Sequence, residues 1–331
     1  MNPRTSTPDL ADRLLRLLRP HLSAPISVSR LLSELKVELP QLTASIAETK
    51  KWGYRLQQSE TEIRLLSCPD LLNDIEIPHY LTTQSIGRTV HAFQSVQSTN
   101  DLAIKLAEEG QPHGAIVVAD RQTAGRGRHD RQWHSPAGLG VYVSIILRPN
   151  IPPTMAPPMS IVAALALAEV FDGYCPDQTQ IKWPNDVLIM GRKAAGILTQ
   201  LSADQDQVDH IIVGVGININ HQESDFPQEL SSLATSLRCA TGKKHSRVRI
   251  LAEFLHQLES EYIRYTKEGL APSQGRLRRF SSLIGRRINL MSGHNRMEAE
   301  VLDIDTEGRL VIKTEDGTKA VTSGEVTIVK E

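Results

Sequence analysis

The stretch Ile211–Ile219, with the sequence IIVGVGINI, is apolar at both its odd and its even positions. A strand with one solvent-exposed face alternates apolar and polar residues, so this pattern predicts a strand covered on both faces. Gly114–Ala119 and Gly140–Leu147 are further apolar strand candidates, and the alanine-rich segment Ser160–Phe171 predicts a helix packed closely on a sheet. These segments together predict an α/β (α+β) core with a mixed central sheet.

The chain has 331 residues, enough for two or three domains, and its pattern changes along its length. Residues 1–67 contain three helical segments and two short apolar runs, which is typical of a winged helix-turn-helix. Residues 68–82 contain two prolines and little periodicity, which predicts a linker. The core follows over 83–280, and short strands separated by glycines over 281–331 predict a small SH3-like β-barrel.

The helices of the first domain have recognisable start signals. Thr7 is a candidate N-cap, with Pro8 at the first position of its helix. Ser27 is the candidate N-cap of a second helix over Val28–Lys36, and a third helix should begin near Pro40. The third helix would be the DNA-reading helix of a winged helix-turn-helix.

DNA binding by this domain is only partly supported by its sequence. The third helix offers Gln41, Thr43 and Ser45 to base edges. The expected wing tip, however, carries Glu60 and Glu62 and no basic residue, whereas phosphate contacts supply much of the affinity for DNA. The alternative is a vestigial helical module, or one that faces another protein.

Charge, cysteines and apolar segments exclude several classes of protein. The formal net charge is −1, so a global basic excess that would indicate nucleic-acid binding is absent. Cys68, Cys175 and Cys239 are far apart, which argues against a disulfide framework or a structural zinc site. The apolar stretch Ile161–Val170 is broken by Glu169 and is too short to span a bilayer. We therefore expect a cytoplasmic protein without a membrane segment.

The stretch Asp120–Trp133, DRQTAGRGRHDRQW, combines glycines with arginines. Gly125 and Gly127 give the backbone conformational freedom, and arginine side chains bind phosphate or carboxylate oxygens two at a time. A flexible loop of this kind can wrap a nucleotide phosphate. The alternative is a solvated basic surface loop.

Three other polar residues could have a functional role, but each also has an ordinary structural explanation. Asp186, in IKWPND, could orient an amine or hold a metal, or could form an Asx turn in a hairpin. Lys193, beside small residues at the start of a strand, could reach into a cleft or be a solvated hairpin charge. Asn218 follows Gly214 and Gly216, which allow close approach of a ligand or simply relieve backbone crowding.

Five motifs occur in order: STND, QTAGRGR followed by a tryptophan, KWPND, RKAAGIL and VGVGININ. Together they closely resemble the biotin protein ligase family, in its bifunctional bacterial form with an N-terminal winged helix. The resemblance is densest over 95–220. It implies that ATP and Mg²⁺ activate biotin as biotinyl-5′-AMP, and that biotin is then transferred to a lysine of a biotin carboxyl carrier protein.

The resemblance also implies roles for individual residues. Biotin binding falls to Ser98, Thr99, Asn100, Gln122, Arg126, Gly127, Arg128 and Lys193. Nucleotide binding falls to Arg128, Trp133, Lys193 and Asn218. The catalytic set is Lys193, Arg126, Arg128 and Asp186, with Asp186 the candidate to orient the carrier lysine or accept its proton. The resemblance further implies a homodimer formed through the central sheet and a secondary role as a biotin-responsive repressor on operator DNA.

The glycine–arginine loop departs from the family pattern at one point. After GRGR the family commonly has Arg-Gly, whereas this chain has His129 and Asp130. Loss of a glycine and gain of an acid predict a stiffer, less positive loop that holds the adenylate less tightly. Two alternatives for the whole chain also stay open: a biotin-responsive regulator that has lost catalysis, and a lipoate ligase.

Overall fold

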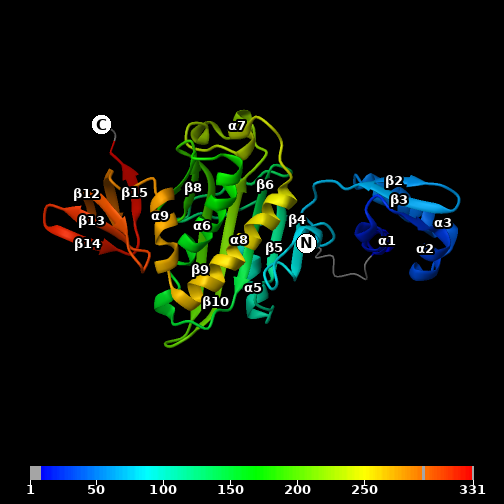
Figure 1. Cartoon of the computed structure of the whole chain (residues 1–331), viewed down its shortest axis with the longest axis horizontal. Coiled ribbons are helices and arrows are strands. Elements are labelled where there is room, and N and C mark those ends of the chain that lie inside the picture. Colours follow the sequence, from blue (N-terminus) through cyan, green and yellow to red (C-terminus); the bar gives the residue numbers. More distant parts are fainter. Residues whose placement is uncertain (1–8, 293–294, 330–331) are drawn as a thin grey trace. The chain divides into compact units, whose positions relative to one another are not determined.

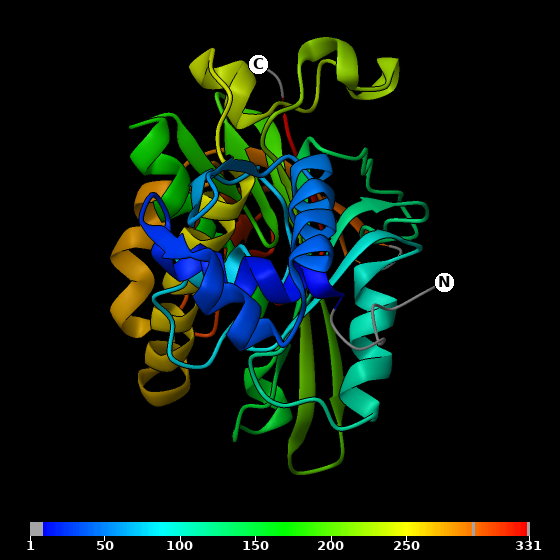
Figure 2. The same ribbon diagram turned by 90° about the vertical axis from the view of Figure 1, so that its right-hand side faces the viewer.

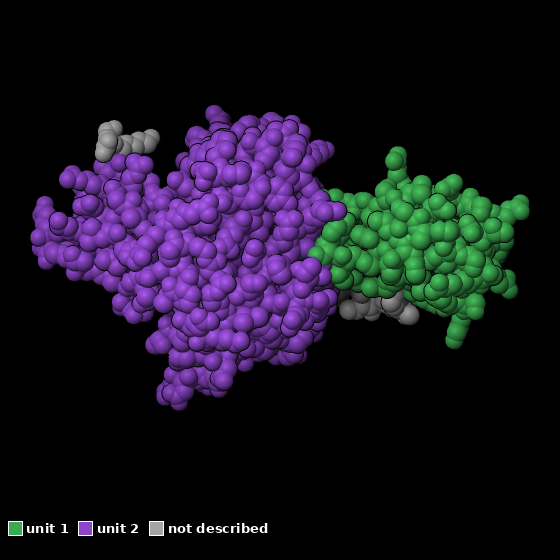
Figure 3. Space-filling view, in the orientation of Figure 1, with its two compact units in different colours: residues 1–80 green, residues 81–331 purple. Residues whose placement is uncertain are grey.

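The computed structural model of the chain describes residues 9–292 and 295–329. Internal contacts divide it into two compact units, residues 1–80 and 81–331, which Figure 3 colours separately. The expected cap at Thr7 and the proline at position 8 lie outside the described residues.

Over its described residues the first unit contains four α-helices, the last of them a single turn, and a small antiparallel sheet with the strand order β1-β3-β2. Its elements are α1 (Leu10–Leu18), β1 (Pro25–Ser27), α2 (Val28–Leu35), α3 (Leu39–Lys51), β2 (Arg55–Gln58), β3 (Glu62–Ser67) and α4 (Ile77–Tyr80). Ser27 caps α2, because its side-chain oxygen accepts a hydrogen bond from the Arg30 backbone N–H. The three helices and the hairpin expected from the sequence are therefore present.

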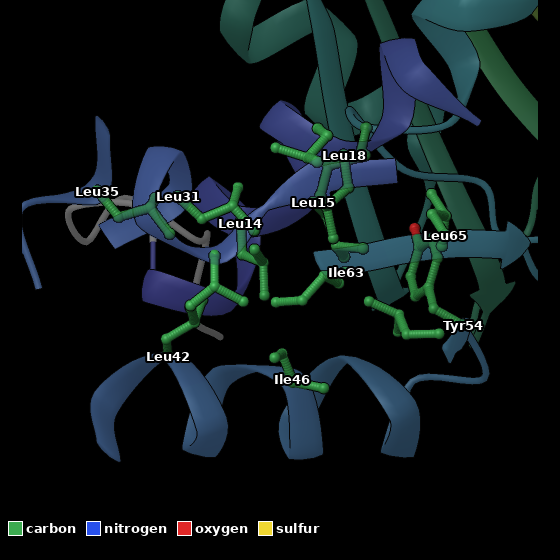
Figure 4. Packing of buried hydrophobic residues seen from close by; sticks show 14 residues of the cluster. Leu14, Leu15, Leu18, Leu31, Leu35, Leu42, Ile46, Tyr54, Ile63 and Leu65 are labelled. Atoms are coloured by element: carbon green, nitrogen blue, oxygen red, sulfur yellow. The ribbon is translucent and has the colours of Figure 1, made fainter. Parts of the chain in front are cut away.

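The core of the first unit is aliphatic. Leu14, Leu15 and Leu18 from α1 meet Ile46 from α3 and Ile63 from β3, and all five are almost fully buried (Figure 4). The same packing corrects one expectation about base contacts. Ser45 is only 5% exposed and donates to the Gln41 carbonyl, so its side chain is not available to DNA. The helix turns it inward because positions three to four residues apart share a face.

The segment 68–82, expected to be a linker between two domains, mostly packs onto the first unit instead. Ile75 belongs to the unit's core. Glu76 accepts a hydrogen bond from Arg19 at 2.8 Å, and both side chains are buried. The unit therefore extends to Tyr80. The sequence did not reveal this segment because its contacts depend on a distant helix rather than on local periodicity.

A seven-stranded sheet forms the centre of the second unit, in the order β4-β5-β6-β10-β9-β8-β7 (Figure 1). Its strands are β4 (Val90–Val96), β5 (Ile116–Gln122), β6 (Gly140–Leu147), β7 (Thr179–Lys182), β8 (Asp186–Ile189), β9 (Arg192–Ala203) and β10 (Val208–Asn218). β4 and β5 run parallel and the other neighbours antiparallel, so the mixed sheet is confirmed. Every residue of β6 is buried, as expected of a central strand.

The helices of this unit are α5 (Thr99–Glu108), α6 (Met159–Tyr174), α7 (Leu237–Thr241), α8 (Arg247–Glu268) and α9 (Gln274–Phe280). α6 packs on β7 to β10, and α8 packs along α6 (Figures 1 and 2). Among the described residues, one helical stretch, Pro153–Tyr174, is long and apolar enough to cross a membrane, but most of it is buried inside the fold. This stretch is therefore a core helix.

The last strands are β11 (Arg287–Ser292), β12 (Asn295–Ile304), β13 (Leu310–Thr314), β14 (Gly317–Val321) and β15 (Glu325–Ile328). They form an antiparallel sheet in the order β14-β13-β12-β11-β15 around residues such as Leu290, Val301 and Ile312. An all-β C-terminal part is thus confirmed, and its closure into an SH3-like barrel stays a prediction. Leu283 is buried in the bend that precedes β11.

Candidate active site

The glycine–arginine loop is an ordered hairpin that follows β5. Gly127 N–H donates to the Arg131 carbonyl at 2.7 Å, and Trp133 N–H donates to the Gly125 carbonyl at 2.9 Å. Arg131 N–H closes the turn onto the Arg128 carbonyl at 3.3 Å. These backbone hydrogen bonds therefore fix the positions from which the arginine side chains extend.

The turn at the tip of this hairpin consists of the two residues that depart from the family pattern. His129 has φ 54° and Asp130 has φ 56°, both in the left-handed region. A hairpin turn with two such residues favours Asn-Gly or Asp-Gly, because glycine adopts positive φ without steric cost. Here the turn is made without glycine, so its geometry must be maintained by contacts around it.

A polar network surrounds the N-terminus of α5. Ser98 is its N-cap, accepting from Asp101 N–H at 3.4 Å. Gln122 Oε1 accepts from the Thr99 backbone N–H at 2.9 Å and from its hydroxyl at 3.1 Å. Gln122 Nε2 in turn donates to Ser135 Oγ at 3.0 Å. The end of β5 and the start of α5, 23 residues apart, are thereby held together.

Asn100 is buried and fully engaged. Its Nδ2 donates to Gln200 Oε1 at 2.9 Å and lies 3.3 Å from the Leu198 carbonyl, while Ser144 Oγ lies 2.6 Å from its Oδ1. A Cβ at Gly214 would lie 1.8 Å from that Oδ1, so only glycine fits there. Sequence reasoning missed Ser144 and Gln200. The signal for Ser144 was a small polar residue within a strand of otherwise apolar and aromatic residues.

Lys193 and Asp186 face each other from adjacent strands, with Nζ 2.7 Å from Oδ1. Asn185 connects this pair to the loop: its Oδ1 accepts from Arg128 Nη1 at 2.9 Å, and its Nδ2 donates to Asp186 Oδ1 at 3.0 Å. The Asn185 amide thus connects the Arg128 guanidinium to the Asp186 carboxylate, which in turn pairs with the Lys193 ammonium. Sequence reasoning treated Asn185 only as part of a turn, because its bridging role depends on the fold of the loop.

Trp133 lies over the two glycine-bearing strands. A Cβ at Gly216 would lie 2.2 Å from the indole Nε1, and one at Gly196 would lie 3.0 Å from the six-membered ring. The Lys193 ammonium is 5.3 Å from the ring centroid. The indole N–H is buried and has no hydrogen-bond partner in the part of the chain that the structure describes. These glycines therefore form a seat for a planar side chain or ligand.

These groups enclose a small cavity of about 50 Å³. Nine of the eleven site residues expected from the sequence line it: Ser98, Thr99, Asn100, Gln122, Arg126, Gly127, Arg128, Trp133 and Lys193. Arg126 at its edge pairs with Asp101 at 3.2 Å. Ile197, Leu198 and Val215 supply the apolar part of the wall.

The two remaining expected residues, Asp186 and Asn218, line a larger neighbouring cleft of about 700 Å³. Lys193 and Trp133 border both spaces. Asn218 is buried and donates to the Thr235 carbonyl at 3.1 Å, which anchors the loop beyond β10. The cleft is also lined by Gly324 and by Glu325, Val326 and Ile328 of β15, so the C-terminal sheet supplies one of its walls.

Positive groups predominate along this cleft. Arg128, Arg131, Lys182 and Lys193 line it, against the carboxylates of Asp186 and Glu325. The guanidinium of Arg131, hydrogen-bonded to Glu325, lowers the pKa of that carboxyl, and His129 and Lys182 add to the effect. A cleft with this charge favours an anionic ligand.

The chain is similar to known proteins in both sequence and fold. Residues 92–218 match the Biotin/lipoate A/B protein ligase family, and residues 283–329 match the Biotin protein ligase C terminal domain. The chain is 38% identical to the bifunctional ligase/repressor BirA of Bacillus subtilis, over 86% of this chain and 87% of that protein. It is 32% identical to the biotin--[acetyl-CoA-carboxylase] ligase of Mycobacterium tuberculosis, over 69% and 85%. The structure is similar to the biotin protein ligase from Aquifex aeolicus in complex with biotin and ATP, with a TM-score of 0.64, 29% identity, and coverage of 74% of this chain and 100% of that one.

Proposed function

Since the chain belongs to the biotin protein ligase family, we propose that it carries out both steps of protein biotinylation. The biotin carboxylate attacks the α-phosphate of ATP, giving biotinyl-5′-AMP and pyrophosphate. A lysine amine of a biotin carboxyl carrier protein then attacks the mixed anhydride, forming an amide and releasing AMP. The observation that supports this most strongly is the convergence of Arg128 and Lys193, through Asn185 and Asp186, on one cavity.

The first step brings a carboxylate against a triphosphate, so like charges must approach each other. Arg126, Arg128 and Lys193 would offset this repulsion, and would do so most as charge develops on the leaving pyrophosphate. The link from Arg128 to Asn185 supports this role, because a preorganised cation does not have to reorient during the reaction.

Biotin has a polar ureido ring and an apolar remainder, and the small cavity offers both kinds of wall. Ser98, Thr99, Asn100 and Gln122 would bind the ureido group. Much of their hydrogen-bonding capacity is already committed, between Thr99 and Gln122 and to neighbouring residues, which would hold the remaining donors and acceptors in fixed directions. The valerate chain would lie along the apolar wall and lead its carboxylate towards Lys193.

The nucleotide would occupy the larger cleft, where Trp133 and Asn218 would line the adenosine. Ligand pockets usually measure about 300–1,000 Å³, so the 700 Å³ cleft is of suitable size and the 50 Å³ cavity is not. The small cavity would therefore have to enlarge when ligand binds. This requires the Trp133 indole to move away from Gly196 and Gly216, over which it lies.

Mg²⁺ fits the donors available along the cleft. This ion keeps several waters and typically takes one or two carboxylates together with substrate phosphates. Asp186 is a carboxylate that lines the larger cleft, and Asn185 adds an amide beside it. When bound, the ion would neutralise phosphate charge.

Asp186 would serve the second step. The carrier lysine must lose a proton before it can attack, and a carboxylate at the reaction centre can orient the amine or accept that proton. The contact with Lys193 supports this, because it holds the carboxylate at the place where the adenylate would form.

Biotin-dependent exchange of pyrophosphate into ATP tests the adenylation step. Exchange with biotin but not with lipoate supports a biotin ligase, and the reverse result supports the lipoate-ligase alternative. Biotin binding without exchange supports a regulator that has lost catalysis. Transfer to a carrier domain then tests the second step.

A second proposed function is biotin-responsive repression by the first unit acting as a winged helix-turn-helix. The three helices with a hairpin favour it, and so does the Bacillus subtilis relative described as a ligase/repressor. Gln41 and Thr43 on α3 stay exposed and would face base edges. Selection of binding sites from random duplex DNA, with and without biotin and ATP, tests this. Absence of any enriched sequence argues for a protein-facing module.

We further propose a cytoplasmic location and a homodimer formed through the central sheet when the adenylate is bound. Both rest on the family resemblance. Sedimentation with and without biotin and ATP tests the dimer.

A further inference from the structure

An ion pair ties the tip of the glycine–arginine loop to the C-terminal sheet. Arg131 donates from its guanidinium to the carboxylate of Glu325, the first residue of β15, although 194 positions separate them in the chain. Both residues line the larger cleft. The contact therefore bridges two walls of the cleft, the loop and β15, which are far apart in the sequence.

The ion pair holds Arg131, and backbone hydrogen bonds of the hairpin connect Arg131 to the segment that carries the catalytic Arg126 and Arg128. The Arg131 carbonyl accepts from Gly127 N–H at 2.7 Å, and Arg131 N–H donates to the Arg128 carbonyl. Arg128 in turn reaches Asn185 at 2.9 Å. Holding the Arg131 side chain consequently holds the segment that carries Arg126 and Arg128.

The hairpin needs such support because its own turn is unfavourable. His129 and Asp130 both have positive φ without being glycine, which raises the free energy of the closed turn. The loop side chains near the tip are largely exposed, so apolar packing contributes little to holding them. Contacts with residues outside the loop must then favour the closed arrangement: Arg126 with Asp101, Arg128 with Asn185 and, nearest the turn, Arg131 with Glu325.

We infer that Glu325 is a positioning residue for the ligase reaction: through Arg131 it keeps the loop closed over the cleft and slows release of the adenylate. This inference rests on the proposed function. It makes a counterintuitive prediction, because removing a carboxylate from a cleft that binds a phosphate should by charge alone tighten binding. Glu325→Gln should nevertheless release the adenylate faster.

The test uses the full-length protein with Glu325→Gln, Arg131→Gln and the charge-swapped pair Arg131→Glu/Glu325→Arg. Asp303→Asn is the matched control, because Asp303 pairs with Arg278 at 2.7 Å and ties the same sheet to α9, away from the cleft. The first readout is amide hydrogen exchange of the peptide spanning residues 123–135 without ligand. The second is the dissociation rate of biotinyl-5′-AMP.

Exposed ion pairs of this kind change equilibria by about two- to fivefold. We expect both single variants to raise loop exchange and adenylate release by this factor, and the swapped pair to restore loop exchange. In 1 M salt wild type and Glu325→Gln should converge, because charges are then screened over about 3 Å. The control should match wild type throughout.

Unchanged loop exchange in Glu325→Gln, or slower adenylate release, overturns the inference. A wild-type protein that forms no adenylate overturns the proposed function instead. In that case the exchange experiment still decides whether Glu325 holds the loop.

Discussion

The ammonium of Lys193 lies 2.7 Å from the carboxylate of Asp186, across the pairing of β8 with β9. Asn185 then connects this carboxylate to Arg128. The two cations proposed to act on the phosphate are thus oriented before any substrate arrives. Preorganisation of this kind is the main way in which polar sites lower a reaction barrier.

Replacing either cation should therefore abolish most of the adenylation activity. We expect Lys193→Ala and Arg128→Ala each to lower biotin-dependent pyrophosphate exchange by roughly 10²–10³-fold. Lys105→Ala is the control, because Lys105 is exposed and pairs only loosely with Glu109, at 3.8 Å. Exchange within a factor of two of wild type in Lys193→Ala would remove Lys193 from the mechanism.

Asp186→Asn should separate the two half-reactions. The amide keeps the shape of the side chain but cannot accept a proton, so transfer from preformed adenylate should fall by roughly 10²-fold. Adenylate formation should fall less. Single-turnover assays of each step measure the ratio, and an equal loss in both would show that Asp186 acts only through Lys193.

Two glycines on β10 offer a matched pair of probes. Gly216→Ala places a Cβ 2.2 Å from the Trp133 Nε1 position, and Gly214→Ala places one 1.8 Å from Asn100 Oδ1. We expect Gly216→Ala to displace the indole and change the tryptophan emission without weakening biotin binding, and Gly214→Ala to weaken biotin binding instead. Calorimetric titration with biotin distinguishes them. Identical binding defects in both variants would contradict separate roles.

Restoring the family sequence at the hairpin tip should tighten adenylate binding. In His129→Arg/Asp130→Gly a glycine replaces a residue with φ 56°, which relieves about 1 kcal/mol of backbone strain, and the loop gains positive charge. The adenylate dissociation rate should then fall below that of wild type. Equal rates would show that neither the strain nor the charge of the turn governs retention.

His221 should make the second unit sensitive to acid. It is fully buried, and neither ring nitrogen has a partner among the described residues. Burial, with a smaller effect of nearby His134, lowers the pKa of His221 to about 4. Because this lies below the unfolded value of about 6.5, the stabilisation is complete above pH 6.5 and is lost as the pH falls towards 4.

The measurement compares His221→Leu with wild type in urea unfolding at pH 7 and pH 5. Wild type should lose about 2 kcal/mol more than the variant between these two values. Equal losses would show that other groups cause the acid sensitivity. Leucine is suitable because the ring stacks on Phe226, with centroids 5.1 Å apart, and makes no hydrogen bond that the variant would leave unpaired among the described residues.

The sequence by itself determined most of the secondary structure and indicated most of the polar residues that line the small cavity. All but the last residue of the apolar run Ile211–Ile219 lies in β10, and Ser27 and Ser98 cap the helices that follow them. Such features depend on side-chain periodicity and on residues within one helical turn, so they can be read locally. The ordered motifs indicated the site for the same reason, because each motif is a short segment.

Only the tertiary structure decided which of these residues touch. The links of Arg128 to Asn185, of Ser144 to Asn100 and of Arg131 to Glu325 join residues 57, 44 and 194 positions apart. Strand order and loop closure bring them together, and neither follows from local sequence. The packing of Ile75 and Glu76 on the first unit belongs to the same class. Such contacts depend on the sum of many burial and pairing free energies over the whole fold, which is why a pattern in one segment cannot predict them.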